Sequence, residues 1–204
     1  MAARMKSGDR RAAIIRSAIH LFAEKGFRGA TTRALASAAG ITEPVLYQHF
    51  GTKRALYDAV VEAKASRIPG RAAELRALSA AGDDRAFFRA AGETILAYYR
   101  DEPEIPRLLL FACLERHELS ELFFERLSLG FDKPLAAHIR RRIRDGAFRK
   151  VNPEIAARGL IGMMSQHALA HVLLPARFAP PDRRVVEQMS GIFLEGIAVK
   201  GAVS

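Results

Sequence analysis

Apolar residues recur at helical spacing along most of the chain, and the strict alternation expected of half-buried strands is nearly absent. The segment 10–25 carries this pattern clearly. Its apolar face, spaced at i, i+4, i+7 and i+8, consists of Ile14, Ala18, Leu21 and Phe22. Gly26 follows, and glycine often ends a helix because it adopts the left-handed conformation without strain. The pattern predicts a helix that stops at Gly26.

Two further helices are predicted with hydroxyl side chains at their starts. The segment RALASAA follows Thr31 and Thr32, either of which can accept a hydrogen bond from a first-turn amide, and Gly40 ends it. Thr52 is placed to cap a longer helix, whose apolar face continues to the sequence IPG at residues 68–70.

Between these two helices lies EPVLYQHF, residues 43–50, which is too short to be a stable helix in isolation. Its start nevertheless carries helix signals. Thr42 occupies the capping position, Glu43 suits the positive end of the helix dipole, and Pro44 is tolerated where first-turn amides lack partners. Gly51 ends the segment, so a third helix is predicted over residues 43–50.

The order of these segments predicts a helix-turn-helix unit. A three-residue turn that begins at Gly40 separates two short helices, and a preceding helix holds them. In this arrangement the second helix of the pair enters the DNA major groove. Leu46 and Phe50, four residues apart, would anchor it to the helices behind, so its other side chains would face base edges and phosphates.

The remainder of the chain is predicted to be helical as well. Further helices are expected from Asp83 or Asp84 through Tyr99, over EIPRLLLFACLER at 104–116, over SELFFERLSLGFDKPLAAHIRRRIRDG at 120–146, from Asn152 and Pro153 to about Pro175, and from about Asp182 to Lys200. The predicted fold class is therefore all-α, with an N-terminal three-helix helix-turn-helix domain followed by a C-terminal helical bundle.

Composition narrows the class of protein. The 204 residues, 50% hydrophobic and 26% charged, are typical of a globular protein with one domain or two small ones. No apolar run approaches the roughly 18 residues that a membrane span needs, and the basic start is unlike a secretory signal. A cytoplasmic protein without membrane association is therefore expected. The single cysteine, Cys113, excludes an internal disulfide and is expected to be a small buried residue rather than a reactive thiol.

Positive charge is concentrated near the N-terminus. Residues 1–60 contain ten Lys or Arg and four acidic residues, which accounts for +6 of the net charge of +10. A basic end on a more balanced body is typical of proteins that contact a polyanion, most often nucleic acid. Because arginine greatly outnumbers lysine, genome base composition can also account for part of this charge.

The segment TTRALASAAGITEPVLYQHFGTKRALYDAVV, which starts at Thr31, resembles the DNA-binding signature of the TetR family of transcriptional repressors. Apolar, glycine, aromatic and basic positions agree in register over roughly residues 8–65. The resemblance implies a DNA-binding domain over residues 8–68, with its motif at about 31–50, and a ligand-binding and dimerisation domain over 69–204. It implies a repressor that binds a palindromic double-stranded DNA operator as a homodimer and is released by an unidentified small-molecule effector.

By resemblance, the expected DNA-binding residues are Thr32, Arg33, Thr42, Glu43, Pro44, Val45, Tyr47, Gln48, His49 and Lys53. Thr32 would be a phosphate-binding cap, and Arg33 would reach a phosphate or a guanine. Tyr47, His49 and Lys53 would anchor phosphates.

The positions implied to vary with the operator are 43, 44, 45 and 48. Gln48 could pair with adenine, Val45 could touch a thymine methyl group, and Glu43 could accept a hydrogen bond from cytosine. Two alternatives stay open: Tyr47 could mainly pack, and Glu43 could serve only the helix dipole.

Within the bundle, the resemblance implies an effector pocket. Candidate lining residues are Phe88, Tyr98, Phe111, His117, Phe124, Met163, Gln166 and His167. The wider supply of aromatic and polar side chains for such a pocket includes Tyr99 and His171. Aromatic residues at helical spacing are also typical of an ordinary core. Residues 155–174 are apolar on too many sides for a helix with one wet face, which indicates either pairing with a second subunit or a central core position.

Other function classes have weaker support. His167 and His171 share a helix face and could hold two corners of a metal site, which makes a metal-dependent protein the alternative function. No third ligand is identifiable, so packing or dimer contacts are preferred and neither a metal nor a cofactor is expected. HELSE at 117–121 lacks the second histidine of a zinc protease, and no enzyme is expected. The basic stretch AHIRRRIRDG at 137–146 could lie on a membrane, but a solvated helix face is favoured.

Overall fold

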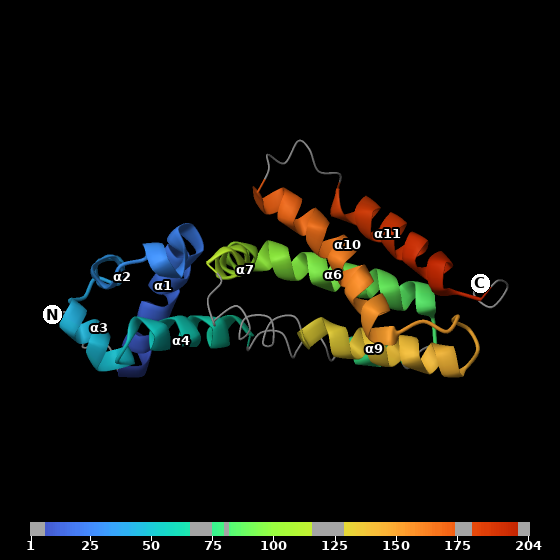
Figure 1. The fold of residues 1–204 in the computed structure, drawn as a ribbon, viewed down its shortest axis with the longest axis horizontal. Coiled ribbons are helices and arrows are strands. Elements are labelled where there is room, and N and C mark those ends of the chain that lie inside the picture. Colours follow the sequence, from blue (N-terminus) through green and yellow to red (C-terminus); the bar gives the residue numbers. More distant parts are fainter. Residues whose placement is uncertain (1–6, 66–74, 80–81, 116–128, 174–180, 200–204) are drawn as a thin grey trace. The chain divides into compact units, whose positions relative to one another are not determined.

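The structure is a computed structural model that describes residues 7–65, 75–79, 82–115, 129–173 and 181–199. These residues form helices and one isolated antiparallel bridge, between Phe148 and Ala198 (Figure 1). The prediction of an all-α fold is confirmed. The chain divides into two compact units: a first unit from residues 1–67 and 104–127, and a second unit from residues 68–103 and 128–204.

The first unit contains α1 (Ser7–Gly29), α2 (Thr32–Ala38), α3 (Glu43–Phe50), α4 (Lys53–Ala65) and α7 (Glu104–Leu114). Helix α1 packs against α2, α4 and α7, and α3 packs against α2 and α4. The large buried side chains of this core include Ile14, Phe22, Leu35, Leu46, Leu56 and Tyr57. The core thus holds the two short helices that could not be stable alone.

Gly26 breaks α1 at the predicted position, although helical residues continue to Gly29 instead of stopping at Gly26. Its φ of 70° is non-helical, so the helix kinks there before its last residues. A Cβ atom at this position would collide with the side chains of Phe111 and Glu115 on and just after α7. The Glu115 Oε1 atom also accepts a hydrogen bond from the Arg28 backbone N–H at 3.1 Å. Glycine therefore provides both the break and the space in which α7 approaches α1.

The helix caps in this unit follow the sequence signals in part. Thr52 accepts a hydrogen bond from Ala55 N at 3.0 Å, which confirms it as the cap of α4. Of the two threonines before α2, Thr31 is the cap, since its Oγ1 accepts from Ala34 N at 3.2 Å. The expectation that Thr42 caps α3 is only half right. Thr42 occupies the N-cap position, but its side chain makes no capping hydrogen bond.

The second unit contains α6 (Asp84–Asp101), α9 (Leu129–Arg144), α10 (Pro153–Leu173) and α11 (Asp182–Ile197). Helix α10 packs against α6, α9 and α11, and α6 packs against α11. Gly92 on α6 permits close packing: a Cβ atom there would lie 2.8 Å from Met164 Cε and 3.2 Å from Val186 Cγ1. These helices form the bundle that the sequence predicts.

A buried polar cluster joins α6 to α9. His138, 1% exposed, stacks on Phe87 with ring centroids 3.8 Å apart. Its Nε2 lies 2.9 Å from Asp84 Oδ1, and its Nδ1 lies 2.9 Å from Ser79 Oγ. The Arg142 Nε–H donates to both Asp84 carboxylate oxygens, at 2.9 and 3.0 Å. Burial lowers the pKa of His138 to about 4, although the neighbouring Asp84 carboxylate opposes this shift.

The stretch 137–146 has the solvated face that is favoured for it, with Arg140, Arg144 and Asp145 exposed, and a second face that packs in the core. His138 and Ile139 are buried, and Arg142 is held by Asp84. Ile139 packs inside the second unit and Ile143 is partly exposed, so the two isoleucines do not form a free lipid-binding face. Among the residues that the structure describes, no helix has the length and apolarity needed to cross a membrane.

Cys113 is another departure from expectation, because it is exposed rather than buried. The buried side of α7 is formed by Ile105, Leu108 and Ala112. Cys113 follows Ala112 by one residue, which turns it about 100° away from that side.

The compact units do not coincide with the predicted domains. The segment 104–114 lies in the same compact unit as the N-terminal helices, although it belongs to the predicted domain 69–204. A division by contacts does not show which residues bind DNA or ligand, so the functional boundary near residue 68 stays a prediction.

Candidate nucleic-acid interface and ligand pocket

Helix α3 is fixed from one side by two apolar anchors. Leu46 is 2% exposed and Phe50 is 7% exposed, and both pack into the first unit. The turn before α3 is set by Gly40, with a φ of 66°, and by a hydrogen bond from Ile41 N to Ala36 O at 3.0 Å. Gly51, with a φ of 68°, ends the helix. The predicted anchoring role of Leu46 and Phe50 is therefore confirmed.

The opposite side of α3 is open to solvent. Tyr47 is 44% exposed, Pro44 and Gln48 are exposed, and Val45 and His49 are partly exposed. Base-reading and phosphate-binding side chains must be accessible on the outer face of such a helix. The five side chains meet this geometric requirement.

Thr32 and Glu43 interact with each other instead of acting separately. Thr32 Oγ1 donates a hydrogen bond of 2.7 Å to Glu43 Oε2, which joins the start of α2 to the start of α3. Thr32 is thus not the cap of α2, a role that Thr31 fills. Because its carboxylate is already bonded and half-buried, Glu43 helps to hold the angle between the two helices.

The basic side chains on the helices around α3 differ in their exposure and in their contacts. Arg33 is exposed at the start of α2. The Lys53 ammonium lies 4.5 Å from the centroid of the Phe27 ring, and partial burial lowers its pKa while Glu115 opposes the shift. The Arg11 guanidinium lies 4.6 Å from the Phe50 ring centroid, a contact that the sequence pattern does not predict.

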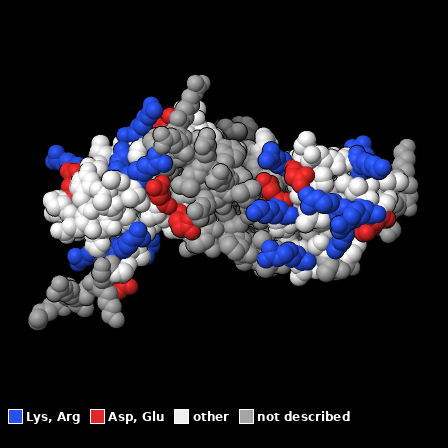
Figure 2. Space-filling model, turned by 60° about the horizontal axis from the view of Figure 1, so that its bottom comes forward, with Lys and Arg blue, Asp and Glu red and all other residues white. Residues whose placement is uncertain are grey.

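The surface charge is mixed as well as positive. On the face in Figure 2, Lys and Arg side chains occur on both units with Asp and Glu side chains among them. Several of the arginines in the second unit have acidic partners, such as Arg142 with Asp84 and Arg140 with Glu154. Charge density alone therefore does not mark the candidate interface, which is defined by side chains of α2, α3 and α4.

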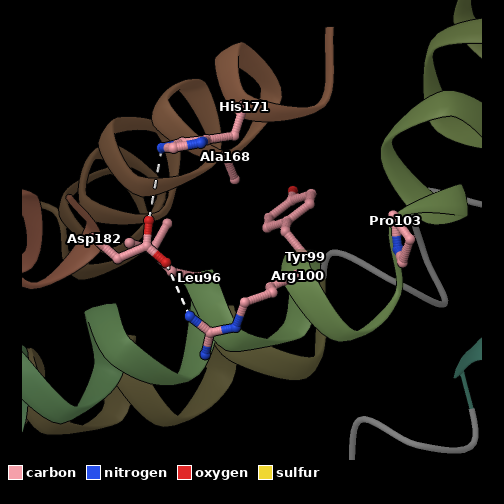
Figure 3. Close-up of a pocket in the computed structure, with 7 residues that line it drawn as sticks. All are labelled: Leu96, Tyr99, Arg100, Pro103, Ala168, His171 and Asp182. Carbon is pink, nitrogen blue, oxygen red and sulfur yellow. Dashed lines mark hydrogen bonds and ion pairs between the residues drawn. The ribbon is translucent and has the colours of Figure 1, made fainter. Parts of the chain in front are cut away.

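The second unit contains an open cavity of about 490 Å³ (Figure 3). Its lining residues are Leu96, Tyr99, Arg100, Pro103, Ala168, His171 and Asp182. Tyr99 donates a hydrogen bond of 3.1 Å to Ser165 Oγ, and burial raises the pKa of the phenol. Most of the remaining wall is apolar, so the cavity combines an apolar lining with a few polar groups.

Asp182 organises the polar side of this cavity. Its Oδ2 accepts a hydrogen bond of 3.0 Å from Arg100 Nη1. Its Oδ1 lies 3.2 Å from His167 Nε2 and 3.8 Å from His171 Nε2. Figure 3 shows the two contacts that link His171, Asp182 and Arg100 in one row.

The pocket residues expected from sequence lie in several places. Phe88 and Tyr98 are buried in the second unit, whereas the Phe111 ring packs beside Gly26 in the first unit. Met163 is partly exposed and Gln166 is exposed on α10, whereas His117 and Phe124 fall outside the described residues.

Of the expected residues, the six that the structure describes do not line the 490 Å³ cavity, although His167 bonds to Asp182, which does. Their role in ligand binding stays a prediction. Tyr99 and His171, from the wider set of aromatic and polar candidates, do line the cavity, whereas Arg100 and Asp182 were not expected there. Only the spacing of His167 and His171 on one helix face gave a sequence signal for this region.

Comparison with known proteins places the chain in a family. Residues 14–60 match the family model described as bacterial regulatory proteins, tetR family, and residues 87–195 match the AefR-like transcriptional repressor C-terminal domain. The second match alone spans more than half of the 204 residues. The chain belongs to the TetR family of transcriptional regulators. The metal-dependent alternative function built on His167 and His171 finds no support in these matches.

Individual TetR proteins resemble different shares of the chain. Tetracycline repressor protein class C from Escherichia coli is 51% identical over 53 residues, which is 26% of this chain and only 24% of that protein. The transcriptional repressor KstR2 from Rhodococcus jostii strain RHA1 is 32% identical over 168 residues, 76% of each protein. A TetR-family regulator from Mesorhizobium loti MAFF303099 has the same fold, with a TM-score of 0.70 and 21% identity over 96% of this chain and 100% of that one.

Proposed function

We propose that this TetR-family protein is a cytoplasmic, homodimeric repressor, which binds a near-palindromic operator through α3 and is released by a small molecule. The observation that carries the proposal is the two-sided character of α3. Leu46 and Phe50 are buried, whereas Tyr47 and Gln48 project from the opposite side. A helix held in this way fits the B-DNA major groove, which is about 12 Å wide.

Distinct side chains of the first unit would position the protein on DNA and read the base sequence. Tyr47, His49 and Lys53, with Arg33 at the start of α2, would contact phosphates and set the register. Gln48 would form two hydrogen bonds with adenine, and exposed or partly exposed groups beside it would contact neighbouring bases. Glu43 is the weakest of the expected base readers, because its carboxylate already accepts from Thr32.

An apolar face on α10 and α11 supports a dimer. Ile155 is 69% exposed and Ile192 is 64% exposed, although isoleucine is usually buried. Gly159 and Gly196 lie in the same groove as these isoleucines. Apart from their chain neighbours and the backbone of their own helices, no atom of the described residues lies within 4 Å of where their Cβ atoms would be. Small residues beside large apolar ones let two helices approach closely. A second copy related by two-fold symmetry would cover the face with the same patch of its own.

The cavity beside Tyr99 supports a ligand-responsive regulator. Its volume of about 490 Å³ falls within the range typical of sites for drug-sized molecules, about 300–1,000 Å³. A ligand that binds one arrangement of the dimer more tightly than the other would shift the population towards it. The difference between the two affinities would set how far the ligand can shift the protein away from the operator-binding arrangement.

Footprinting on the protein's own genomic DNA tests the proposal. The expected footprint has two protected patches on one side of the duplex, about 34–36 Å apart, because the two copies of α3 in the dimer enter successive major grooves.

A pair of arginine variants tests which surface contacts the DNA. Arg33→Ala should weaken operator binding about tenfold or more by removing a charged contact. Arg144→Ala, which removes the same charge from an exposed site on α9, is the matched control and should bind normally. Equal binding by the Arg33 and Arg144 variants, or no discrete footprint, would refute the docking.

A further inference from the structure

The side chains of α10 and α11 converge at one point beside the cavity. His167 and His171 are one turn apart on α10, and Asp182 is the first residue of α11. One potential ligand atom from each residue lies within 4.8 Å of the other two. The carboxylate supplies the third ligand that the sequence alone could not identify. We propose that these three residues bind a divalent transition-metal ion of the zinc class.

The distances suit such an ion. With metal–donor bonds of about 2.0–2.1 Å, the donors of a tetrahedral site lie about 3.4 Å apart. Asp182 Oδ1 lies 3.2 Å from His167 Nε2 and 3.8 Å from His171 Nε2, values on either side of that separation. The two histidine nitrogens lie within 4.8 Å of each other, so rotation of the imidazole side chains would bring all three atoms around one ion.

The donor types select the class of metal. Two imidazole nitrogens and one carboxylate oxygen suit Zn²⁺, Ni²⁺ or Co²⁺, whereas Mg²⁺ and Ca²⁺ prefer shells of oxygen. A site with three protein ligands leaves at least one position for water or a bound molecule. Here that position would open towards the 490 Å³ cavity, since His171 and Asp182 both line it. The ion would therefore form part of the proposed effector site.

Neighbouring groups orient the ligands. Arg100 Nη1 binds Asp182 Oδ2 at 3.0 Å, which leaves Oδ1 directed to the histidines. His171 lies in the last turn of α10, where the negative end of the helix dipole favours a cation. The positive charge of Arg100 opposes the ion, but the Arg100 side chain is 65% exposed and this repulsion is screened by solvent.

The simpler alternative is a pair of interhelical hydrogen bonds to Asp182 without any metal. Titration of Zn²⁺ into the full-length, tag-free, EDTA-treated protein distinguishes the two, with calorimetry and thermal melting as readouts. The metal site predicts saturable binding of about one ion per chain and a rise in melting temperature, because an ion that binds only the folded state stabilises it. Mg²⁺ should produce neither effect.

Two ligand variants assign the site. His171→Ala and Asp182→Asn should each weaken Zn²⁺ binding by at least about 100-fold, more than the loss of a residue that only orients a ligand. His20→Ala removes a histidine whose side chain is 75% exposed in the first unit, and this control should bind Zn²⁺ like wild type. Melting in EDTA checks that the variants fold. Absorption of bound Co²⁺ in the wild type, lost in both ligand variants, would be an independent sign of coordination by these groups.

The metal site deepens the proposed effector function but can fail separately from it. No saturable Zn²⁺ binding, or binding unchanged in both ligand variants, would overturn the site. Operator binding is measured in EDTA as a separate assay. Retained operator binding without Zn²⁺ binding would refute the metal site alone, whereas Zn²⁺ binding without a footprint would refute the operator proposal alone.

Discussion

The buried cluster around His138 makes the stability of the protein depend on pH. His138 lies between Asp84 and Ser79 and is stacked on Phe87, with 1% of its surface exposed. Burial lowers its pKa to about 4, and the desolvation effect outweighs the attraction of Asp84. An unfolded histidine has a pKa of about 6.5. The unfolded state therefore binds a proton more tightly than the folded state does.

The sign and size of the effect follow from this difference. As the pH falls from about 6.5 to about 4, the proton favours the unfolded chain, so the free energy of unfolding decreases. Each pKa unit corresponds to about 1.4 kcal/mol, which gives a full loss of roughly 3 kcal/mol below pH 4. For a protein of this size, that loss lowers the melting temperature by about 6–12 °C.

His138→Gln is the perturbation that isolates this contribution. Glutamine keeps a donor and an acceptor for Asp84 and Ser79 but does not titrate. Urea unfolding at fixed protein concentration, repeated from pH 7.5 to 4, measures the free energy of unfolding for wild type and variant. The stability of the variant should fall less steeply with acidification. The exposed His20→Gln is the control and should follow wild type. Identical pH profiles for wild type and His138→Gln would refute this account of the cluster.

Three further perturbations test other parts of the structure. Ile155→Glu should shift the protein from dimer to monomer in sedimentation at micromolar concentration, because a buried unpaired carboxylate is costly at an interface; an unchanged dimer would exclude this face. Lys53→Ala should reduce the slope of log affinity against log salt for operator binding by about 1.8, or about 0.9 for each subunit; an unaltered slope would remove Lys53 from the phosphate contacts. Asn152→Ala removes an acceptor that lies 3.0 Å from both Glu154 N and Ile155 N, and it should cost about 1 kcal/mol in chemical denaturation; equal stability would contradict its role as cap of α10.

Local signals were sufficient to predict much of the first unit. The predicted third helix at 43–50 has the same bounds as α3, because Glu43 and Pro44 favour a start and Gly51 permits a stop within a few residues. Gly26 produces the predicted break, and Thr52 is the predicted cap. These effects depend on a residue and its near neighbours in sequence, so the chain order alone contains them.

The choice between Thr31 and Thr32 shows where local signals become insufficient. Either hydroxyl can cap a helix, and a shift of one residue in the helix start exchanges their roles. The structure assigns the cap to Thr31 and turns Thr32 towards Glu43, which is 11 residues away in sequence. That contact depends on the angle between α2 and α3, which no short sequence window determines.

Long-range polar contacts could not be predicted. Asp84 is separated from His138 by 54 residues and from Arg142 by 58, and no periodicity relates these positions. Asp182 was visible only as a helix start, although its carboxylate reaches His167 on the preceding helix. Such contacts are set by how the bundle packs, whereas apolar periodicity only shows which side of each helix is covered.

The most direct test of the central claim is the base preference of Gln48→Ala at every position of the operator. If α3 lies in the major groove, this variant should lose preference at one position in each half-site, where a bidentate contact contributes about 1–3 kcal/mol of discrimination. Preferences at the other positions should persist. An unchanged base profile in a folded Gln48→Ala variant that still binds the operator would show that Gln48 does not read the sequence, in contradiction to the proposed docking.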